Sequence, residues 1–251
     1  MSPKKQPYKQ GDVVRFSNST LGTFEECPRC FWLEQRHGIK RPRGIFPSLP
    51  GGVDRVLKVY FDEHMSAGTM PPEMADLAGA TPFPDRGMME LWRNWRNLIV
   101  DIDGIAFLSG ALDELIVWPD GLHSPYDYKT RGAAPKEGAS EEYYGTQLDI
   151  YHLLVEKGCK LKCNGDGYLG YYWPAGVAGH GDFKFHTSVV KLQTDPARAV
   201  KLVHDAVECL ALDAPPDSSA MCEYCSFVFN NNTVTSAYMN ELTPDIREAK
   251  P

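Results

Sequence analysis

The chain has no run of about 18 apolar residues, and this absence argues against a membrane-spanning helix. Residues 1–10 are polar and Lys-rich with no apolar segment behind them, which is unlike a secretory signal. No internal repeat occurs, so solenoid architectures are excluded as well. We therefore expect a cytoplasmic protein with no membrane partner.

An excess of positive charge is also missing. The net charge at pH 7 is −7, from 26 Lys and Arg against 33 Asp and Glu. This balance disfavours a protein that coats nucleic acid, because such domains tend to be basic. It is compatible with a nuclease, since a magnesium site needs acidic side chains. Basic residues still gather within 36–43, a segment that also fits a solvated loop.

Apolar residues are plentiful enough for a core. Of the 251 residues, 43% are hydrophobic and 24% are charged, which is typical of a folded chain. The length fits one large domain. We expect a polar N-terminal segment over residues 1–16, a folded domain over 17–226 with a Pro-, Gly- and Ala-rich insertion loop at 66–87, and a C-terminal tail over 227–251.

The periodicity of apolar residues predicts a mixed α/β fold, with a central β-sheet flanked by helices. Pro28 marks a break in the first helix, and residues 91–100 fit either a short helix or a strand. Predicted helices cover residues 18–36, 52–66, 141–157 and 197–212, and predicted strands cover 105–108, 111–118, 124–130, 167–173 and 183–191.

Two aspartates and a lysine fall on two of these neighbouring strands. Asp113 lies on one, Asp127 and Lys129 lie on the next, and a Pro-Asp-Gly turn at 119–121 joins them. Strand side chains alternate, so Asp127 and Lys129 share a face that Asp113 can reach. Two carboxylates suit Mg²⁺ or Mn²⁺, and a lysine can orient water for phosphodiester hydrolysis. By itself, Asp-x-Lys is more often a pair of exposed strand residues.

The surrounding sequence resembles a known family. GALDE at 110–114 followed by YDYKT at 126–130 resembles the active-site hairpin of the RecB-like branch of PD-(D/E)XK nucleases. Gln147 and Tyr151 match the Gln-x-x-x-Tyr helix that follows in that branch, and their spacing places them on one helical face. Residues 19–28 keep the spacing of the N-terminal Ser-x-Leu-x-x-Phe-x-x-Cys-Pro motif.

The resemblance spans residues 17–226 and implies a restriction-endonuclease-like nuclease domain there. It also implies a further metal ligand on the helix that follows a glycine, where Asp54 stands and no histidine does; His64 is ten residues further along. The implied metal ligands are thus Asp54, Asp113 and Asp127. The implied catalytic set is Asp113, Asp127, Lys129, Gln147 and Tyr151.

Two C-x-x-C pairs stand near the two ends of the chain, Cys27 with Cys30 and Cys222 with Cys225. Brought together, they would form a tetrathiolate site for zinc or an iron–sulfur cluster. CRISPR-associated RecB-like exonucleases and AddB-type helicase–nucleases carry a 4Fe–4S cluster held by one N-terminal and three C-terminal cysteines. Here no third cysteine follows Cys225, so Cys30 would supply the fourth thiolate.

On this resemblance we expect a 4Fe–4S cluster, with Zn²⁺ as the alternative that a two-plus-two pattern also suits and four free thiols as another. The remaining cysteines, Cys159, Cys163 and Cys209, are interpreted as buried apolar or spectator residues. Cys159 and Cys163 also form a weaker alternative pair.

The resemblance implies a deoxyribonuclease that acts on single-stranded or end-containing DNA, in DNA repair or CRISPR-linked defence. Exonuclease or endonuclease action, cleavage polarity and oligomeric state are left open at this point. Two other functions compete: a non-catalytic nucleic-acid-binding subunit of a repair or defence complex, and an iron–sulfur or zinc structural protein whose acidic hairpin is incidental.

Overall fold

The computed structural model describes residues 8–9, 11–42, 44 and 48–242, with the backbone alone for 237–242. Parts of the predicted N-terminal segment and C-terminal tail lie outside the described residues. The chain divides into two compact units, described in turn. The smaller comprises residues 1–12, 22–43 and 208–251, and the larger comprises 13–21 and 44–207.

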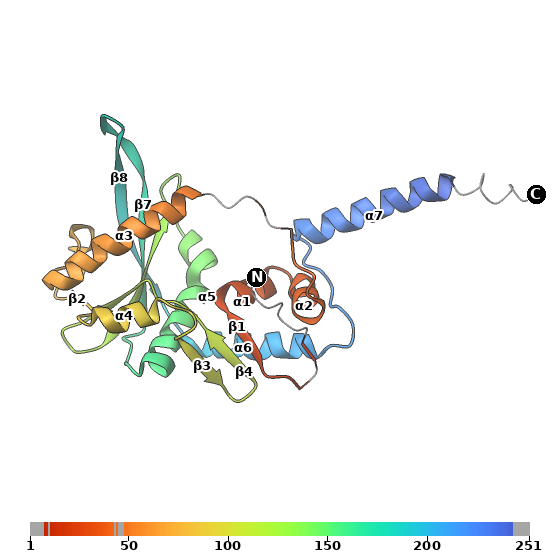
Figure 1. The fold of residues 1–251 in the computed structure, drawn as a ribbon, viewed down its shortest axis with the longest axis horizontal. Helices are drawn as coiled ribbons and strands as arrows, with labels where there is room; N and C mark the ends of the chain where they lie inside the picture. Colours follow the sequence, from red (N-terminus) through yellow and green to blue (C-terminus); the bar gives the residue numbers. More distant parts are fainter. Residues whose placement is uncertain (1–7, 10, 43, 45–47, 243–251) are drawn as a thin grey trace, which may run out of the picture. The chain divides into compact units, whose positions relative to one another are not determined.

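The larger unit is built on a five-stranded mixed sheet in the order β2-β5-β6-β7-β8, of which Figure 1 labels β2, β7 and β8. The central strand β6 is antiparallel to β5 and parallel to β7. A parallel pair needs a crossover connection, and helix α5 (Ala139–Leu154) supplies it. The strands are β2 (Thr81–Pro82), β5 (Glu114–Val117), β6 (His123–Thr130), β7 (Asp166–Gly179) and β8 (Asp182–Gln193).

Helices cover both faces of this sheet. Phe61 of α3 (Ser48–Ala67) packs against the rings of Tyr126 and Tyr128 on one face of β6. Side chains alternate along a strand, so Asp127 and Lys129 face the other way, toward α5. The short α4 (Arg86–Trp92) and the turn η1 (Pro72–Met74) complete this part of the unit.

A separate three-stranded sheet lies in the same unit, in the order β1-β4-β3. Its strands are β1 (Val14–Ser17), β3 (Ile99–Ile102) and β4 (Ala106–Ser109). Ser17 ends β1 and begins α1 (Asn18–Glu26), where its hydroxyl accepts a hydrogen bond from the Thr20 amide. This bond satisfies an amide that has no partner inside the helix.

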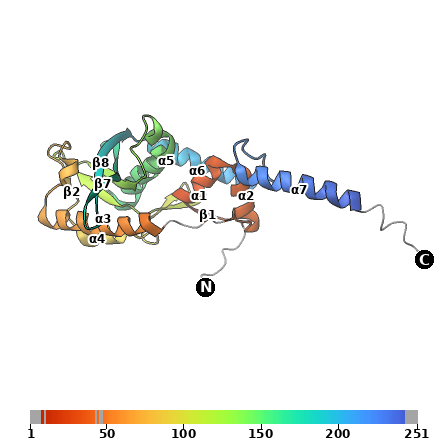
Figure 2. The same ribbon diagram turned by 90° about the horizontal axis from the view of Figure 1, so that it is seen from above.

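The smaller unit contains α2 (Pro28–His37), the last turn of α6 (Pro196–Ala211) and α7 (Glu223–Leu242). Trp32 and Arg36 on α2 donate hydrogen bonds to the carbonyls of Leu212 and Leu210. These bonds join α2 to the last turn of α6 and to the residue that follows it. Figure 2 shows α7 as a single straight helix, and residues 226–236 of it are exposed.

The predicted fold class is confirmed: a mixed sheet is flanked by helices. The break at Pro28 is present between α1 and α2. Residues 91–100 contain both of the predicted alternatives, the end of α4 and the start of β3. No described helix is long and apolar enough to cross a membrane.

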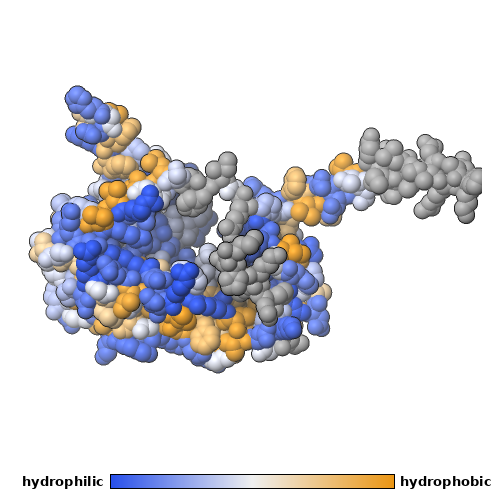
Figure 3. Space-filling model, in the orientation of Figure 1, coloured by the Kyte–Doolittle hydropathy of each residue, from blue (hydrophilic) through white to orange (hydrophobic). Residues whose placement is uncertain are grey.

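Other elements differ from the prediction. The strand expected over 111–118 begins only at Glu114, because the Leu112 amide bonds to the Trp92 carbonyl instead of to β6. Strand β7 runs past its predicted end at residue 173 to Gly179, and with the start of β8 it forms a two-stranded arm (Figures 1 and 3). Val177 and Phe183 of this arm are exposed. The segment expected as an insertion loop contributes buried Met74 and Ala80 to the core.

Candidate active site and metal centre

The central strand β6 carries the Asp-x-Lys pair. Asp127 is buried, and its Oδ2 atom lies 2.5 Å from Lys129 Nζ. Asp127 and Lys129 pair with Leu169 and Tyr171 of β7, whereas the pairing of β6 with β5 ends one residue earlier, at Tyr126. The Asp127 and Lys129 side chains lie on the same face of β6, as predicted from the alternation of strand side chains.

Gln147 on α5 joins these two residues. Its side-chain amide donates to Asp127 Oδ1 over 2.9 Å, and its Oε1 accepts from Lys129 Nζ over 2.9 Å. The amide also contacts Tyr151 Oη at 2.7 Å. One side chain therefore holds the carboxylate, the ammonium and the phenol, which keeps the sheet residues and the helix residues in one hydrogen-bonded group.

Tyr144 adds an aromatic face to this group. The Lys129 ammonium lies 4.6 Å from the centre of the Tyr144 ring, a cation–π contact. Tyr144 lies in the helix predicted over residues 141–157 but was not among the site residues expected from the sequence. Its position three residues before Gln147 is the signal that it shares the same helical face.

Asp113 lies one residue before β5 and not on it. Burial and the negative charge of Asp127 raise the pKa of the Asp113 carboxyl well above its usual range. Lys58 of α3 opposes this shift, with its Nζ 3.8 Å from Asp113 Oδ1. The structure thus brings Asp113 close enough to Asp127 for the two charges to repel.

Asp54 is the predicted ligand with the weakest connection to this group. It lies on α3 and forms an ion pair with Lys58 at 2.9 Å, one helical turn away. Lys58 therefore contacts both Asp54 and Asp113. Among the described residues, the sets of three or more possible ligands whose atoms all lie within 4.8 Å of one another do not include Asp54, Asp113 or Asp127.

Arg93 supports the site from α4's C-terminal end, and sequence reasoning missed it. Its Nε donates to the Asp113 carbonyl at 3.0 Å, and its other nitrogens pair with Asp62 and Glu114. Burial raises the pKa of the Glu114 carboxyl to about 7, against the effect of Arg93. Arg93 is a positioning residue for Asp113, and no local spacing in the sequence connects the two.

The donor set fits a divalent cation. Asp127 Oδ2 is buried and accepts no well-directed hydrogen bond from a described side chain. The Asp113 carboxyl is close enough to Asp127 for the negative charge of Asp127 to raise its pKa. Asp127 is buried and Asp113 is half-buried, and two such carboxylates that repel one another are stabilised by a hard cation bound between them. Asp113 and Asp127 are the residues that would hold it, and Lys58 already supplies positive charge beside Asp113.

Comparison with known proteins now adds the family. The sequence model described as the PD-(D/E)XK nuclease superfamily matches residues 55–229 of this chain. The chain belongs to the PD-(D/E)XK nuclease superfamily. Among solved structures, it is similar to one titled "Crystal structure of SSO0001", with a TM-score of 0.40 and 16% identity over 83% of this chain and 80% of that one. No curated protein matches the chain.

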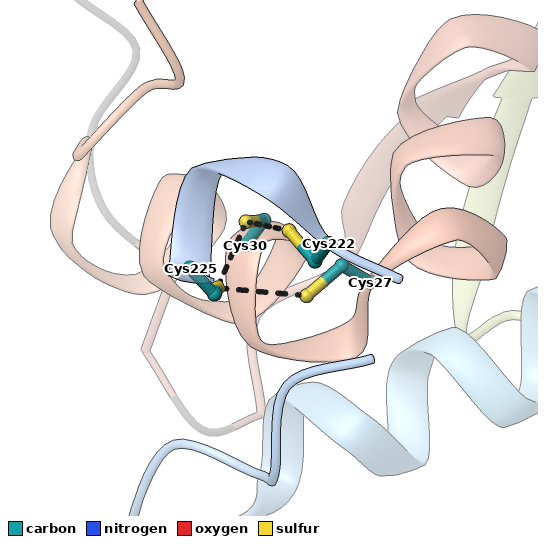
Figure 4. A group of neighbouring side chains, drawn as sticks. All are labelled: Cys27, Cys30, Cys222 and Cys225. Carbon is teal, nitrogen blue, oxygen red and sulfur yellow. Dashed lines mark hydrogen bonds between the residues drawn. The ribbon is translucent and has the colours of Figure 1, made fainter. Parts of the chain in front are cut away.

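The two C-x-x-C pairs of this PD-(D/E)XK protein meet in the smaller unit (Figure 4). The four Sγ atoms lie within 4.8 Å of one another. Cys27 and Cys225 are separated by 3.8 Å, and Cys30 lies 3.6 Å from both Cys222 and Cys225. The N-terminus of α2 and the N-terminus of α7 supply two cysteines each, and the four thiols can hold a zinc ion or an iron–sulfur cluster.

The electrostatics of this four-cysteine centre suit bound metal. Burial raises the pKa of Cys27, but backbone hydrogen bonds from Cys30 and Ser219 lower it to about 7. Burial raises the pKa of the Cys225 thiol, and its thiol neighbours raise it further. Thiols packed this closely ionise together only when a cation compensates them. Arg41 adds a donor 3.9 Å from Cys222 Sγ.

The remaining three cysteines lie outside this centre. Cys209 is buried, and burial raises its pKa to about 11. Cys159 and Cys163 are half-buried, and burial raises the pKa of each to about 12. Cys163 also belongs to a second possible ligand group, with His152 and Glu156, and its pairing with Cys159 stays a prediction.

Proposed function

We propose that this chain is a metal-dependent deoxyribonuclease that hydrolyses phosphodiester bonds in single-stranded or end-containing DNA. The observation that carries the proposal is the hydrogen-bonded group in which Gln147 joins Asp127 to Lys129. Membership of a nuclease superfamily supports the reaction class. The resemblance to the RecB-like branch supports DNA as the substrate and an end or single strand as its form.

The proposed roles follow from the contacts. Mg²⁺ or Mn²⁺, when bound, would polarise the phosphate and lower the pKa of water. Asp113 and Asp127 would hold it, with Asp54 as a further ligand once Lys58 is displaced from it. Lys129 would orient the attacking water and offset negative charge on the phosphate. Gln147 and Tyr151 would keep Lys129 and Asp127 in place.

The ammonium of Lys129 is suited to this role by its partners. A carboxylate, an amide oxygen and an aromatic face surround it, and together they hold the side chain in one position. A charged lysine beside the phosphate stabilises a transition state in which negative charge accumulates on oxygen. The side chain is 19% exposed, so a substrate can reach it.

Lys129→Ala tests the proposal. The wild-type protein should cleave end-labelled single-stranded DNA in Mn²⁺, and Lys129→Ala should abolish cleavage. Lys191→Ala is the matched control, because Lys191 is an exposed lysine on β8 of the same sheet, paired with Asp166. Cleavage by Lys129→Ala at the wild-type rate would overturn the catalytic proposal. Binding of DNA without cleavage would favour the non-catalytic subunit instead.

We also propose that the four-cysteine centre holds one zinc ion and not a 4Fe–4S cluster. Zn–S bonds of about 2.3 Å in a tetrahedron place the sulfurs about 3.8 Å apart. Three of the Sγ separations here are 3.6–3.8 Å, and all four Sγ atoms lie within 4.8 Å of one another. In a four-iron cluster each thiolate binds a different corner of the cube, so the sulfurs stand roughly 6 Å apart. The two-plus-two arrangement supports the same choice.

Metal analysis separates the two cofactors. Protein purified without oxygen should be colourless and contain zinc at the four-cysteine centre, and Cys222→Ser should lose that zinc. A brown protein with about four iron atoms and sulfide would overturn the zinc assignment. It would leave the nuclease proposal untouched, because the two sites share no ligand.

A further inference from the structure

A second group of metal-ligand side chains stands at the end of α5, in the larger unit. A ring nitrogen of His152, a Glu156 carboxylate oxygen and Cys163 Sγ all lie within 4.8 Å of one another. The His152 side chain is buried, while that of Glu156 is 41% exposed. The group is therefore buried at His152 and open to solvent at Glu156.

The local fold brings these three residues together. His152 and Glu156 are four residues apart and share a helical face, and a π-helical turn (Val155–Cys159) follows α5. Segment 162–164 then runs beside His123, held by two backbone hydrogen bonds of 2.9 and 3.0 Å. The Cys163 amide donates to Glu156 Oε1 at 3.4 Å, so Cys163 is placed next to Glu156.

Hydrogen bonds define which nitrogen of His152 is free. Thr194 Oγ1 donates its proton to the Gly165 carbonyl at 3.0 Å. The contact of 2.6 Å between Thr194 Oγ1 and His152 Nδ1 is then a bond that Nδ1 donates. In the neutral ring, Nε2 is consequently left with its lone pair. A hydrogen bond on one nitrogen that orients the other is the usual support of a metal-binding histidine.

The lone pair of Nε2 faces an anion. It lies 3.3 Å from Glu156 Oε1, and two electron-rich atoms at this distance repel unless a proton or a metal ion lies between them. Zn–N and Zn–O bonds of about 2.0–2.1 Å place two tetrahedral ligands about 3.3 Å apart. A set of nitrogen, oxygen and sulfur ligands suits zinc, whereas Mg²⁺ and Ca²⁺ prefer oxygen alone.

We propose that His152, Glu156 and Cys163 bind a zinc-class divalent ion, independently of the nuclease site and of the four-cysteine centre. Binding forms one metal–sulfur bond and releases the Cys163 thiol proton to solvent. The fourth coordination position is open, beside the partly exposed Glu156 carboxylate, as in zinc sites that bind water or an exogenous ligand.

Cobalt titration of the full-length protein, with its four-cysteine centre loaded as purified, tests this site. Apart from any Co²⁺ held by oxygen ligands at the carboxylate site, wild type should take up one equivalent of Co²⁺ with tetrahedral visible bands and the absorption of a single thiolate, and Zn²⁺ should displace it. Losing a direct ligand should cost at least as much as losing its hydrogen-bond support, so Glu156→Gln should weaken binding about 100-fold.

Two cysteine variants make the test specific. Cys163→Ser should remove the thiolate absorption, whereas Cys159→Ser should retain it, because Cys159 is a nearby half-buried thiol outside the group. Glu156→Gln alters a partly exposed residue and should leave thermal unfolding of the metal-free protein unchanged, which keeps the test valid if His152 variants fail to fold.

Three results would overturn the proposal. The first is no thiolate-bound cobalt beyond the four-cysteine centre, which would make the His152–Glu156 contact an ordinary ion pair of a protonated histidine. The second is unchanged affinity in Glu156→Gln. The third is a four-thiolate spectrum that Cys163→Ser does not alter, which would show that cobalt had only exchanged into the four-cysteine centre.

Discussion

The carboxylate site and the four-cysteine centre are assembled in opposite ways. Asp113, Asp127, Lys129 and Gln147 come from one hairpin and the helix that follows it, within 35 positions of the sequence. The thiols that meet in the other centre are 192 to 198 residues apart. The first is positioned by strand pairing and helix packing, whereas the second closes a loop of almost the whole chain.

The difference indicates which interactions stabilise each site. Asp127 and Lys129 are linked by side-chain hydrogen bonds that need no metal to form. The four thiols have mainly one another as partners, and closing so long a loop carries a large entropic cost. We therefore expect the carboxylate site to be preorganised without metal and the four-cysteine centre to depend on its ion.

The largest expected effect separates the two sites through catalysis. Asp127→Asn removes the buried charge that pairs with Lys129 and should slow cleavage of labelled single-stranded DNA about 1,000-fold or more. The metal content of the four-cysteine centre should not change. Asp166→Asn, which alters another acidic residue of the same sheet, is the control. Wild-type rates in Asp127→Asn would show that this carboxylate is not a metal ligand.

The second effect is on stability. Cys225→Ser should release the ion of the four-cysteine centre, and a loss of about 3 kcal/mol would lower the melting temperature by roughly 10 °C in a chain of this size. Cleavage measured well below the transition should stay near wild type. Cys209→Ala provides the comparison, a buried cysteine outside the centre, and should retain the ion. Equal destabilisation with the ion retained in both variants would contradict the assignment.

The third prediction concerns the packing beneath the carboxylate site. A Cβ atom at Gly170 would stand 1.7 Å from Tyr126 Oη, and Tyr126 is fully buried beside Asp127. Gly170→Ala should therefore reduce the free energy of unfolding by about 2 kcal/mol. Gly176→Ala on the same strand meets nothing within 4 Å and should have little effect in chemical denaturation. Similar stability of the two variants would refute the steric argument.

The smallest expected effect tests whether Gln147 only holds Asp127 and Lys129 in position or takes part in the reaction itself. Gln147→Leu keeps the approximate volume but loses the hydrogen bonds to Asp127, Lys129 and Tyr151, so kcat should fall about tenfold with KM unchanged. Tyr143→Ala, on the exposed side of the same helix, should match wild type. A loss as large as that of Asp127→Asn would instead place Gln147 among the reacting groups.

Much of the carboxylate site could be predicted because its geometry is local. Alternation along β6 places Asp127 with Lys129, and a four-residue interval places Gln147 with Tyr151. Arg93 and Lys58 could not be found in this way, because they reach Asp113 through the packing of α3 and α4. Their contacts depend on tertiary structure and leave no period in the sequence.

The fold shows the same limit at its edges. The core elements were predicted from apolar periods, but α7 was not assigned, because its apolar residues follow no clear helical stripe and many of them are exposed, such as Phe227 and Phe229. The segment at 66–87 has no period either. It is nevertheless ordered by side chains such as Glu73, which accepts hydrogen bonds from Tyr60 and Tyr172.

The central place of β6 has a consequence for how the protein opens. Strand β6 pairs with β5 over its first half and with β7 from Tyr126 onward, and Asp127 is buried, whereas the far end of the β7–β8 arm is exposed to solvent. Amide hydrogens near Asp127 should therefore exchange with deuterium only on global unfolding, while those of the arm exchange early. Local fraying can remodel the periphery of this protein while the residues that would do its chemistry stay in register.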